Sequence, residues 1–246
     1  MSEMGDIWHT ASGDERLDRA QVHVWRADLP TQAACVEHVQ DVLSADERAR
    51  AERYPLAENR RRFVAARALL RHVLSRYADC PPDQLCFAYG EHGKPHLVGS
   101  SNPLEFNMSH SGDVVLYAVA RGRAVGVDVE QQRARSNYMR IAERFFSIEE
   151  YEALNALPAA DQPRAFYRCW TRKEAYVKAR GDGIAAGLDT FSVSLDERAA
   201  ILRSDEGASE TARWNMSSLQ LGDGYVGALC SEGAECDIAQ FAWSYS

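Results

Sequence analysis

Hydrophobic and polar residues recur with clear periods along most of this 246-residue chain, and these periods predict its elements. Strict alternation in "QVHVW" predicts a strand at residues 21–25. In "NRRRFVAARALLRHVLSRY", residues 59–77, apolar side chains three and four positions apart predict an amphipathic helix, which the following prolines end. The segment 104–130 alternates again and predicts three strands, the last two of which join in a tight turn at Gly122.

Helix-capping signals indicate three further helices. The motif S-x-x-E, in which a serine and a glutamate cap the first turn reciprocally, begins at Ser44 and again at Ser147. A longer helical pattern, "PRAFYRCWTRKEAYVKAR", covers residues 163–180 and opens with a proline. Gly181 follows it, and glycine commonly ends helices. We therefore expect helices after Ser44, after Ser147 and over residues 163–180.

The remaining segments are short and extended. "LCFAYGEHGKPHL", residues 85–97, predicts two short strands around a glycine-containing turn, and the tail alternates in "TFSVSL", "ARWNMSSLQL" and "YVGALCSE". Strands and helices mix without a regular βαβ rhythm, so the predicted class is α+β. The order of elements is loosely repeated, which predicts two similar halves, residues 1–124 and 125–246, each a small antiparallel sheet packed against helices.

Composition limits the classes of protein that this chain can belong to. Hydrophobic residues make up 46% of it, no apolar run approaches the ~20 residues of a membrane span, and the start "MSEMGDIWHT" lacks signal-peptide features. The six cysteines form no CxxC pair, which favours reduced thiols, so we expect a cytoplasmic protein without a membrane role. The net charge of −8 argues against general nucleic-acid binding.

One segment departs from this acidic balance. Residues 48–76 hold nine arginines against two glutamates. Such a concentration predicts a polyanionic ligand or an acidic partner, while a solvated helix face remains the alternative.

Two carboxylates lie within the apparently buried strand "GVDVE". Side chains alternate along a strand, so Asp128 and Glu130 share one face. Two like charges this close repel each other, and an unpaired buried carboxylate costs several kcal/mol. A cation should therefore lie beside them.

The long helix offers both a third carboxylate and a cation. Trp170, Glu174 and Lys178 are spaced i, i+4, i+8 and lie along one stripe. Three hard oxygen ligands describe a magnesium site, and Lys178 would then be a phosphate-binding cation beside the metal. An ordinary surface ion pair and a water-facing edge strand are the alternatives.

Two loops carry groups suited to phosphate. "NMSHSGD" presents Ser109, His110 and Ser111 at the end of a strand, and "GEHGKP" holds Lys94 between a glycine and Pro95. Each signal is weak alone, because a single histidine or lysine in a loop is usually structural or solvated. Together with the acids they favour a phosphate-containing substrate.

The motifs "FVAARALLR", "GKPHL", "FNMSHS", "GVDVE", "RFFSIEEYEAL" and "WTRKEAYVKARGDG" resemble, in order, those of the Sfp-type phosphopantetheinyl transferases. The resemblance covers about residues 50–194, and it implies a pseudo-dimeric α+β monomer that binds coenzyme A and Mg²⁺ between two halves. It also implies transfer of the phosphopantetheine arm of coenzyme A to a serine of an apo acyl, peptidyl or aryl carrier protein. Adenosine 3′,5′-bisphosphate would be the other product.

The resemblance also implies roles for individual residues. The metal ligands would be Asp128, Glu130 and Glu174. Lys178 would contact the pyrophosphate, and the nucleotide would be held by Ser109, His110, Lys94 with Pro95, and Arg71, with Arg53 and Arg67 as helpers. The proton of the carrier serine would be taken by Glu174, by Lys178 or by a metal-bound water.

The sequence also indicates where a carrier would dock. The segment "QQRARSNYMRIAERFF" mixes cations with apolar residues, as a docking surface for an acidic carrier should, through Arg133, Arg135, Tyr138, Met139 and Arg140. A solvent-facing loop is the alternative. Two other functions remain open at this point: a magnesium-dependent phosphohydrolase that cleaves a nucleotide pyrophosphate with water, and a non-catalytic module that binds coenzyme A or a carrier.

Overall fold

The computed structural model describes residues 8–11, 13, 15–29, 40–99, 103–133, 137–183 and 187–244. Its elements, in chain order, are β1 (His9–Thr10), β2 (Gln21–Asp28), η2 (Gln40–Val42), α2 (Ala45–Glu52), α3 (Ala57–Ser75), η3 (Pro82–Gln84), β3 (Phe87–Tyr89), β4 (Pro95–Leu97), β5 (Leu104–Ser111), β6 (Val114–Arg121), β7 (Val125–Gln131), α4 (Tyr138–Phe145), α5 (Ile148–Asn155), α6 (Gln162–Arg180), η5 (Leu188–Thr190), β8 (Phe191–Val193), β9 (Ile201–Ser204), α7 (Ala208–Arg213), β10 (Trp214–Leu219), β11 (Tyr225–Glu232) and β12 (Asp237–Ala242). The predicted α+β class is confirmed.

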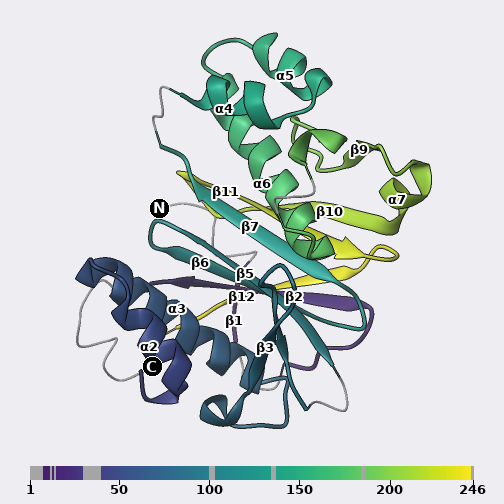
Figure 1. Cartoon of the computed structure of the whole chain (residues 1–246). Coiled ribbons are helices and arrows are strands. Elements are labelled where there is room, and N and C mark those ends of the chain that lie inside the picture. The colour runs from purple at the N-terminus through teal and green to yellow at the C-terminus, as the bar shows by residue number, and fades with distance from the viewer. Residues whose placement is uncertain are drawn as a thin grey trace.

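Two sheets form the centre of the molecule (Figure 1). The larger has the strand order β1-β12-β2-β6-β5; β1, β12 and β2 are parallel, whereas β2, β6 and β5 are antiparallel neighbours. The smaller is antiparallel, with the order β10-β11-β7. Figure 1 shows α2 and α3 beside the larger sheet and α6 beside the smaller one.

Alternation along β6 explains how these layers stack. Val115, Tyr117 and Val119 pack with α3 in one apolar core. The residues between them point the other way, as the period of two requires, and pack against Val125, Val127 and Val129 of β7 in a second core. A third core joins the opposite face of the smaller sheet to α6. The order of layers is therefore α3, larger sheet, smaller sheet, α6.

A glycine allows α6 to approach β7 closely. A Cβ on Gly126 would lie 2.1 Å from the carbonyl oxygen of Ala175 and 2.3 Å from the amide nitrogen of Ala179. Neither backbone atom could move without shifting the helix. Gly126 therefore lets the helix that carries Glu174 and Lys178 lie directly on the strand that carries Asp128 and Glu130.

Most predicted elements are present. Both capping boxes form, at Ser44 and at Ser147, and Gly181 ends α6 with a φ of 83°. The predicted tail strand at 212–221 is instead the end of α7 followed by β10. β12 was not predicted; it pairs with β2, more than 200 residues earlier in the chain, so the last strand of the C-terminal half belongs to the sheet of the N-terminal half. The similarity of the two halves and their division at residue 124 stay predictions.

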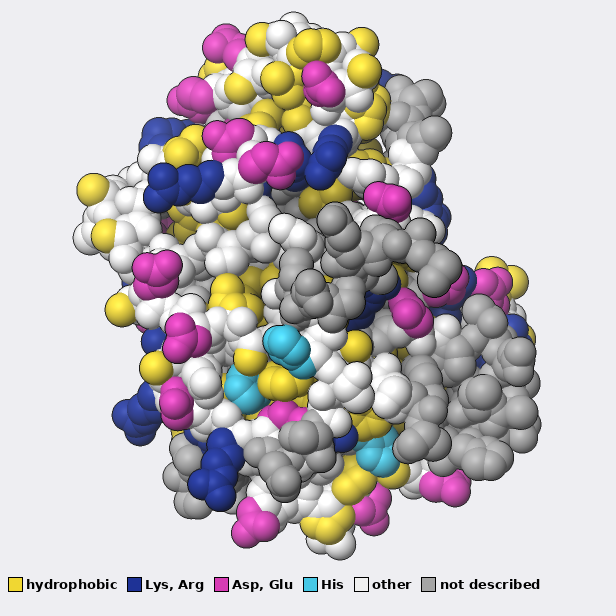
Figure 2. Space-filling view, turned by 180° about the vertical axis from the view of Figure 1, so that it is seen from behind, with side chains coloured by type: hydrophobic (Ala, Val, Ile, Leu, Met, Phe, Trp, Pro, Cys, Tyr) yellow, Lys and Arg dark blue, Asp and Glu magenta, His cyan; other side chains and the backbone are white. Residues whose placement is uncertain are grey.

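On the face shown in Figure 2, basic and acidic side chains are interspersed, and no large area carries a single sign. No helix within the described ranges is long and apolar enough to span a membrane.

Candidate active site

Lys178 is the cation that the acid pair requires. Its Nζ donates to Oδ1 of Asp128 at 2.6 Å and lies 3.1 Å from Oγ of Ser109. The Ser109 hydroxyl also donates to Oδ1 of Asp128, at 2.7 Å. Asp128 is only 4% exposed, so this charge-assisted pair compensates its burial.

Alternate residues of β5 hold β7 by side-chain hydrogen bonds. The Asn107 side-chain oxygen accepts from the Val127 amide at 2.9 Å, and the Ser111 hydroxyl donates to Oε2 of Glu130 at 2.8 Å. Ser109 occupies the position between them. The two serines of "SHS" therefore orient the carboxylates, a role that the sequence did not reveal because the contact joins separate strands.

Glu174 completes the acidic group from the helix side. Burial, and then the negative charge of Asp128, raise the pKa of Glu174, whereas Lys178 lowers it. These mutual effects place the three side chains in one electrostatic neighbourhood. Trp170, Glu174 and Lys178 are all half-buried along one stripe of α6, as their spacing predicts.

The carboxylates suit a divalent cation in donor type. Oδ2 of Asp128 is buried and has no hydrogen-bond partner among the described residues, so one carboxylate oxygen is available to a ligand. Carboxylate oxygens are the donors that Mg²⁺ prefers. Within the described ranges, no three histidine, cysteine, aspartate or glutamate side chains are already gathered as a metal site, and the Lys178 ammonium lies on Asp128. Asp128, Glu130 and Glu174 thus fit the ion chemically.

A cavity of about 270 Å³ lies next to these residues. It is lined by Lys94 and Pro95 of the β3–β4 hairpin, by Asn107, and by Glu174 and Lys178 of α6. Nζ of Lys94 donates to the carbonyl oxygens of Val125 at 3.1 Å and Ala179 at 3.0 Å, and burial lowers the pKa of Lys94. Lys94 therefore fastens the hairpin to both β7 and α6.

The charges of two cations act on His110, which is exposed at the end of β5. Desolvation of its ring, and then the charges of Lys178 and Arg62, hold the pKa of His110 below its ordinary value. Arg62 lies on α3 and is paired with Asp113, beside the β5–β6 turn, at 2.8 Å. Nothing in the sequence distinguished Arg62 from its eight neighbouring arginines, since its position depends on how α3 packs on the sheet.

Arg71 lies in the interior of the protein. It is only 1% exposed; its Nε donates to Oε2 of Glu47 at 2.7 Å and its Nη1 to the carbonyls of Pro82 and Leu85 at 2.9 Å. Arg67 pairs with the same Glu47 and donates to the Tyr89 hydroxyl at 3.1 Å. Both arginines are thus engaged in the interior, where they hold the segment leading into the β3–β4 hairpin, and their contact with a nucleotide stays a prediction.

The other predicted residues differ in their exposure. Arg53 is exposed at the end of α2. Of the predicted docking residues, Arg133 and Arg140 are exposed, whereas Tyr138 and Met139 are half-buried against the core of the second half. Arg135 lies outside the described residues. The docking role of this segment stays a prediction.

Clustered carboxylates, a lysine bonded to one of them and cations around a histidine are typical of enzymes that act on phosphate groups with a divalent cation. Residues 124–230 match the family model of the 4′-phosphopantetheinyl transferase superfamily, and residues 25–121 match that of the 4′-phosphopantetheinyl transferase N-terminal region.

Three relatives illustrate the similarity. HetI, a 4′-phosphopantetheinyl transferase of Nostoc sp., is 38% identical over 91% of this chain and 90% of its own length. A putative 4′-phosphopantetheinyl transferase of Synechocystis sp. is 36% identical, with coverage of 82% and 80%. Sfp of Bacillus subtilis is 30% identical, with coverage of 83% and 88%.

The chain belongs to the 4′-phosphopantetheinyl transferase superfamily. The resemblance drawn from its motifs is confirmed, and with it the enzyme class, a phosphopantetheinyl transferase. The comparisons give no support to a phosphohydrolase.

Proposed function

We propose that this chain transfers the 4′-phosphopantetheine arm of coenzyme A to a serine of an apo acyl or peptidyl carrier protein and releases adenosine 3′,5′-bisphosphate. The observation that carries the proposal is the hydrogen-bonded group of Asp128, Ser109 and Lys178 in a chain of this family. Within this group, Oδ2 of Asp128 is buried and has no partner among the described residues. In this proposal Asp128, Glu130 and Glu174 hold Mg²⁺, which when bound neutralises the pyrophosphate charge and polarises the phosphorus.

The cations of the chain position the donor. In this proposal Lys178 contacts the pyrophosphate, which is supported by its place in the lining of the cavity that Lys94 and Pro95 also line. Arg62 supplies a second positive charge, and His110 beside it, whose lowered pKa keeps its ring neutral, can donate a hydrogen bond to the remaining phosphate of the nucleotide. Holding the donor at two charged points fixes the phosphorus for attack by the serine oxygen.

Glu174 is the best-supported base. Glu174 lines the same cavity as Lys94 and Lys178, where the proposal places the reacting serine. Nζ of Lys178 already donates to Asp128 and to Ser109, which leaves it suited to stabilise negative charge. We therefore assign proton removal from the carrier serine to Glu174, directly or through a water.

We further propose a cytoplasmic enzyme that works as a monomer on carrier proteins and not on nucleic acid. The proposal of a monomer is supported by one chain bringing together residues of three elements: Asn107, Ser109 and Ser111 from β5, the carboxylates from β7, and Glu174 with Lys178 from α6. A second copy is not needed to complete it.

The test is the intact mass of an apo acyl carrier protein after incubation with this protein, coenzyme A and Mg²⁺. We expect a gain of one phosphopantetheine arm, abolished by EDTA and by Asp128→Ala. If the enzyme with Asp128→Ala modified the carrier as well as the parent enzyme does, the carboxylate group would have no part in the mechanism.

A further inference from the structure

A cavity of about 540 Å³ lies apart from the site described above. It lies between the N-terminal half of α6, the β10–β11 turn and Gln132, the residue after β7. Arg164, Arg168 and Arg172 line it at the spacing i, i+4, i+8, so they form a stripe along one side of the helix. It shares no lining residue with the cavity of Lys94 and Lys178.

Arg172 brings a buried positive charge to this cavity. It is 1% exposed, and its guanidinium donates to uncharged oxygens, including the Ser194 carbonyl at 2.6 Å, the Asp196 carbonyl at 2.7 Å and the Ser218 hydroxyl at 3.0 Å. No carboxylate among the described residues lies within ion-pairing distance of it. Burial, and then the charge of Arg168, lower the pKa of Arg172 to about 10, so it stays cationic at neutral pH. Buried charges are normally paired, which makes this one unusual.

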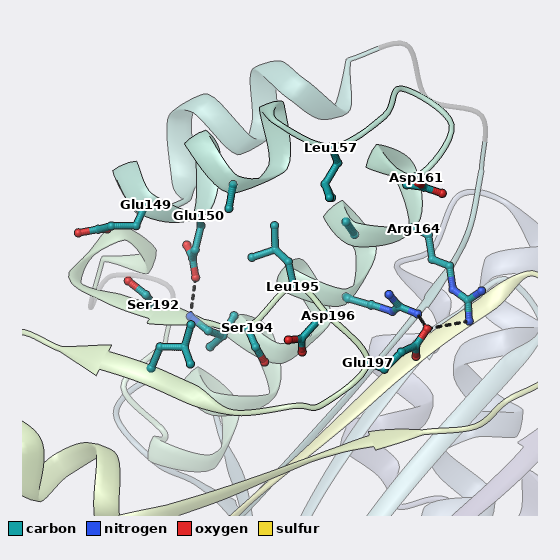
Figure 3. A pocket seen from close by; sticks show the side chains of 15 residues that line it. Glu149, Glu150, Leu157, Asp161, Arg164, Ser192, Ser194, Leu195, Asp196 and Glu197 are labelled. Carbon is teal, nitrogen blue, oxygen red and sulfur yellow. Dashed lines mark hydrogen bonds and ion pairs between the residues drawn. The ribbon is translucent and has the colours of Figure 1, made fainter.

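Arg164 and Arg168 share one carboxylate partner, Glu197. Glu197 lies 4.0 Å from Arg164 and pairs more closely with Arg168, yet its side chain is 80% exposed. Figure 3 shows these ion pairs from a neighbouring cavity of about 570 Å³, which the same three side chains also line. The pair of Arg164 with Glu197 is exposed on both sides, and such pairs contribute little stability, so another carboxylate can compete with Glu197 for Arg164. Counting Asp223, which also lines the cavity, three positive charges face two negative ones.

The cavity adjoins the strand that carries the proposed metal ligands. Val226 lines the cavity and is the cross-strand partner of Glu130. The Gln132 amide donates to the Gly224 carbonyl at 2.7 Å and closes the same edge. A macromolecule that brings a serine to Glu130 would therefore lie beside Gln132 and Val226, which line this cavity together with the arginines.

We propose that this cavity docks a carboxylate side chain of the carrier protein, near the serine that is modified, and that Glu197 occupies the position of that carboxylate in the free enzyme. The proposal rests on the proposed function, since it names the chemistry of the same substrate. It adds Arg164 and Arg168 as residues that set carrier specificity.

The experiment measures steady-state transfer to an apo acyl carrier protein of varied concentration, at saturating coenzyme A and Mg²⁺. Arg164→Glu should raise the KM for the carrier about tenfold, because one attractive charge pair becomes repulsive, while kcat and the KM for coenzyme A change by less than about twofold. Glu197→Gln should lower the KM for the carrier a few-fold, because the competing internal carboxylate is gone. Both residues are largely exposed, so folding should be retained.

Arg203→Glu is the matched control. Arg203 is 42% exposed, pairs with Asp205 and Glu149, and does not line the cavity, yet its substitution changes the net charge equally. It should leave the KM for the carrier within about twofold of the parent. A second arm repeats the series on the same carrier with the aspartates and glutamates flanking its serine changed to asparagine and glutamine. There the effect of Arg164→Glu should fall below about threefold.

Each other outcome overturns the docking proposal. Equal effects of Arg164→Glu and Arg203→Glu would show only a general charge effect, and an undiminished effect on the neutralised carrier would show that no carrier carboxylate is read. A change confined to the KM for coenzyme A would assign the cavity to the nucleotide. In these cases the proposed function stands, because transfer still occurs; only a parent enzyme that modifies no carrier would refute both proposals.

Discussion

Replacing Lys173 by methionine should destabilise the protein strongly. Lys173 directly precedes Glu174 in the sequence, but its role is structural. Lys173 is fully buried, and its Nζ donates to Oε2 of Glu150 and to the carbonyls of Leu188 and Phe191, each at 2.7 Å. Glu150 is 2% exposed and also accepts from the amides of Ser147 and Val193. The pair therefore joins α6 to the start of α5 and to β8.

The expected magnitude follows from what the substitution leaves behind. Methionine fills similar space but supplies no charge, so Glu150 becomes a buried carboxylate held by two backbone amides, and two carbonyls lose their donor. Removing one partner of a buried ion pair costs about 3–5 kcal/mol. For a domain of this size that lowers Tm by roughly 6–20 °C. Urea unfolding followed by circular dichroism would give the free energy, provided that the slope is unchanged.

Two further variants make the result decisive. Glu150→Gln combined with Lys173→Met should recover part of the loss, because the uncompensated charge is gone. Lys178→Met, further along the same helix, removes the cation of buried Asp128 and should also lower stability, but less than Lys173→Met, because Lys178 is partly exposed and Ser109 still donates to Asp128. It should reduce transfer severely. A Lys173→Met protein within about 1 kcal/mol of the parent would refute the assignment of Lys173 to the interior pair.

Three other predictions follow from the geometry of the site. Arg71→Ala should lower Tm without changing the ratio of the KM for coenzyme A to the KM for 3′-dephospho-coenzyme A. Arg62→Ala should raise the KM for coenzyme A more than the KM for 3′-dephospho-coenzyme A. A shifted ratio with Arg71→Ala would return Arg71 to the nucleotide site. Because burial and then Asp128 raise the pKa of Glu174, the metal-free folded protein binds that proton more tightly than the unfolded chain, so stability should fall as pH rises through the raised pKa. Glu174→Gln should raise Tm at neutral pH and abolish transfer, and a lower Tm would contradict the shift. Trp170→Ala should cost about 2–3 kcal/mol, below the value for a fully buried ring, because Trp170 is half-buried against Phe166; an unchanged Tm would show that this packing is unimportant.

Local patterns predicted the elements of the site well. Period-two alternation placed Asp128 and Glu130 on one face, and helical spacing placed Glu174 and Lys178 on one stripe, because both depend only on backbone geometry. The need for a cation beside two buried acids was also predictable from the cost of burying charge. The structure supplies that cation as Lys178.

What could not be predicted depends on packing between distant segments. Arg71 belongs to the arginine-rich helix, yet its partner Glu47 is a capping residue of another helix, and only the packing of α2 on α3 buries the pair. Arg62 could not be predicted for the same reason, because its neighbours His110 and Asp113 belong to the distant β5–β6 hairpin. Strand β12 was missed because its pairing partner lies at the other end of the chain.

The most direct test of the central claim is the ratio of adenosine 3′,5′-bisphosphate released to holo-carrier formed, measured in one reaction with coenzyme A and Mg²⁺. Transfer predicts a ratio of one to one and no release when the carrier is omitted. Release of the bisphosphate without a carrier, or in excess of holo-carrier, would contradict the account and show that water takes the place of the serine.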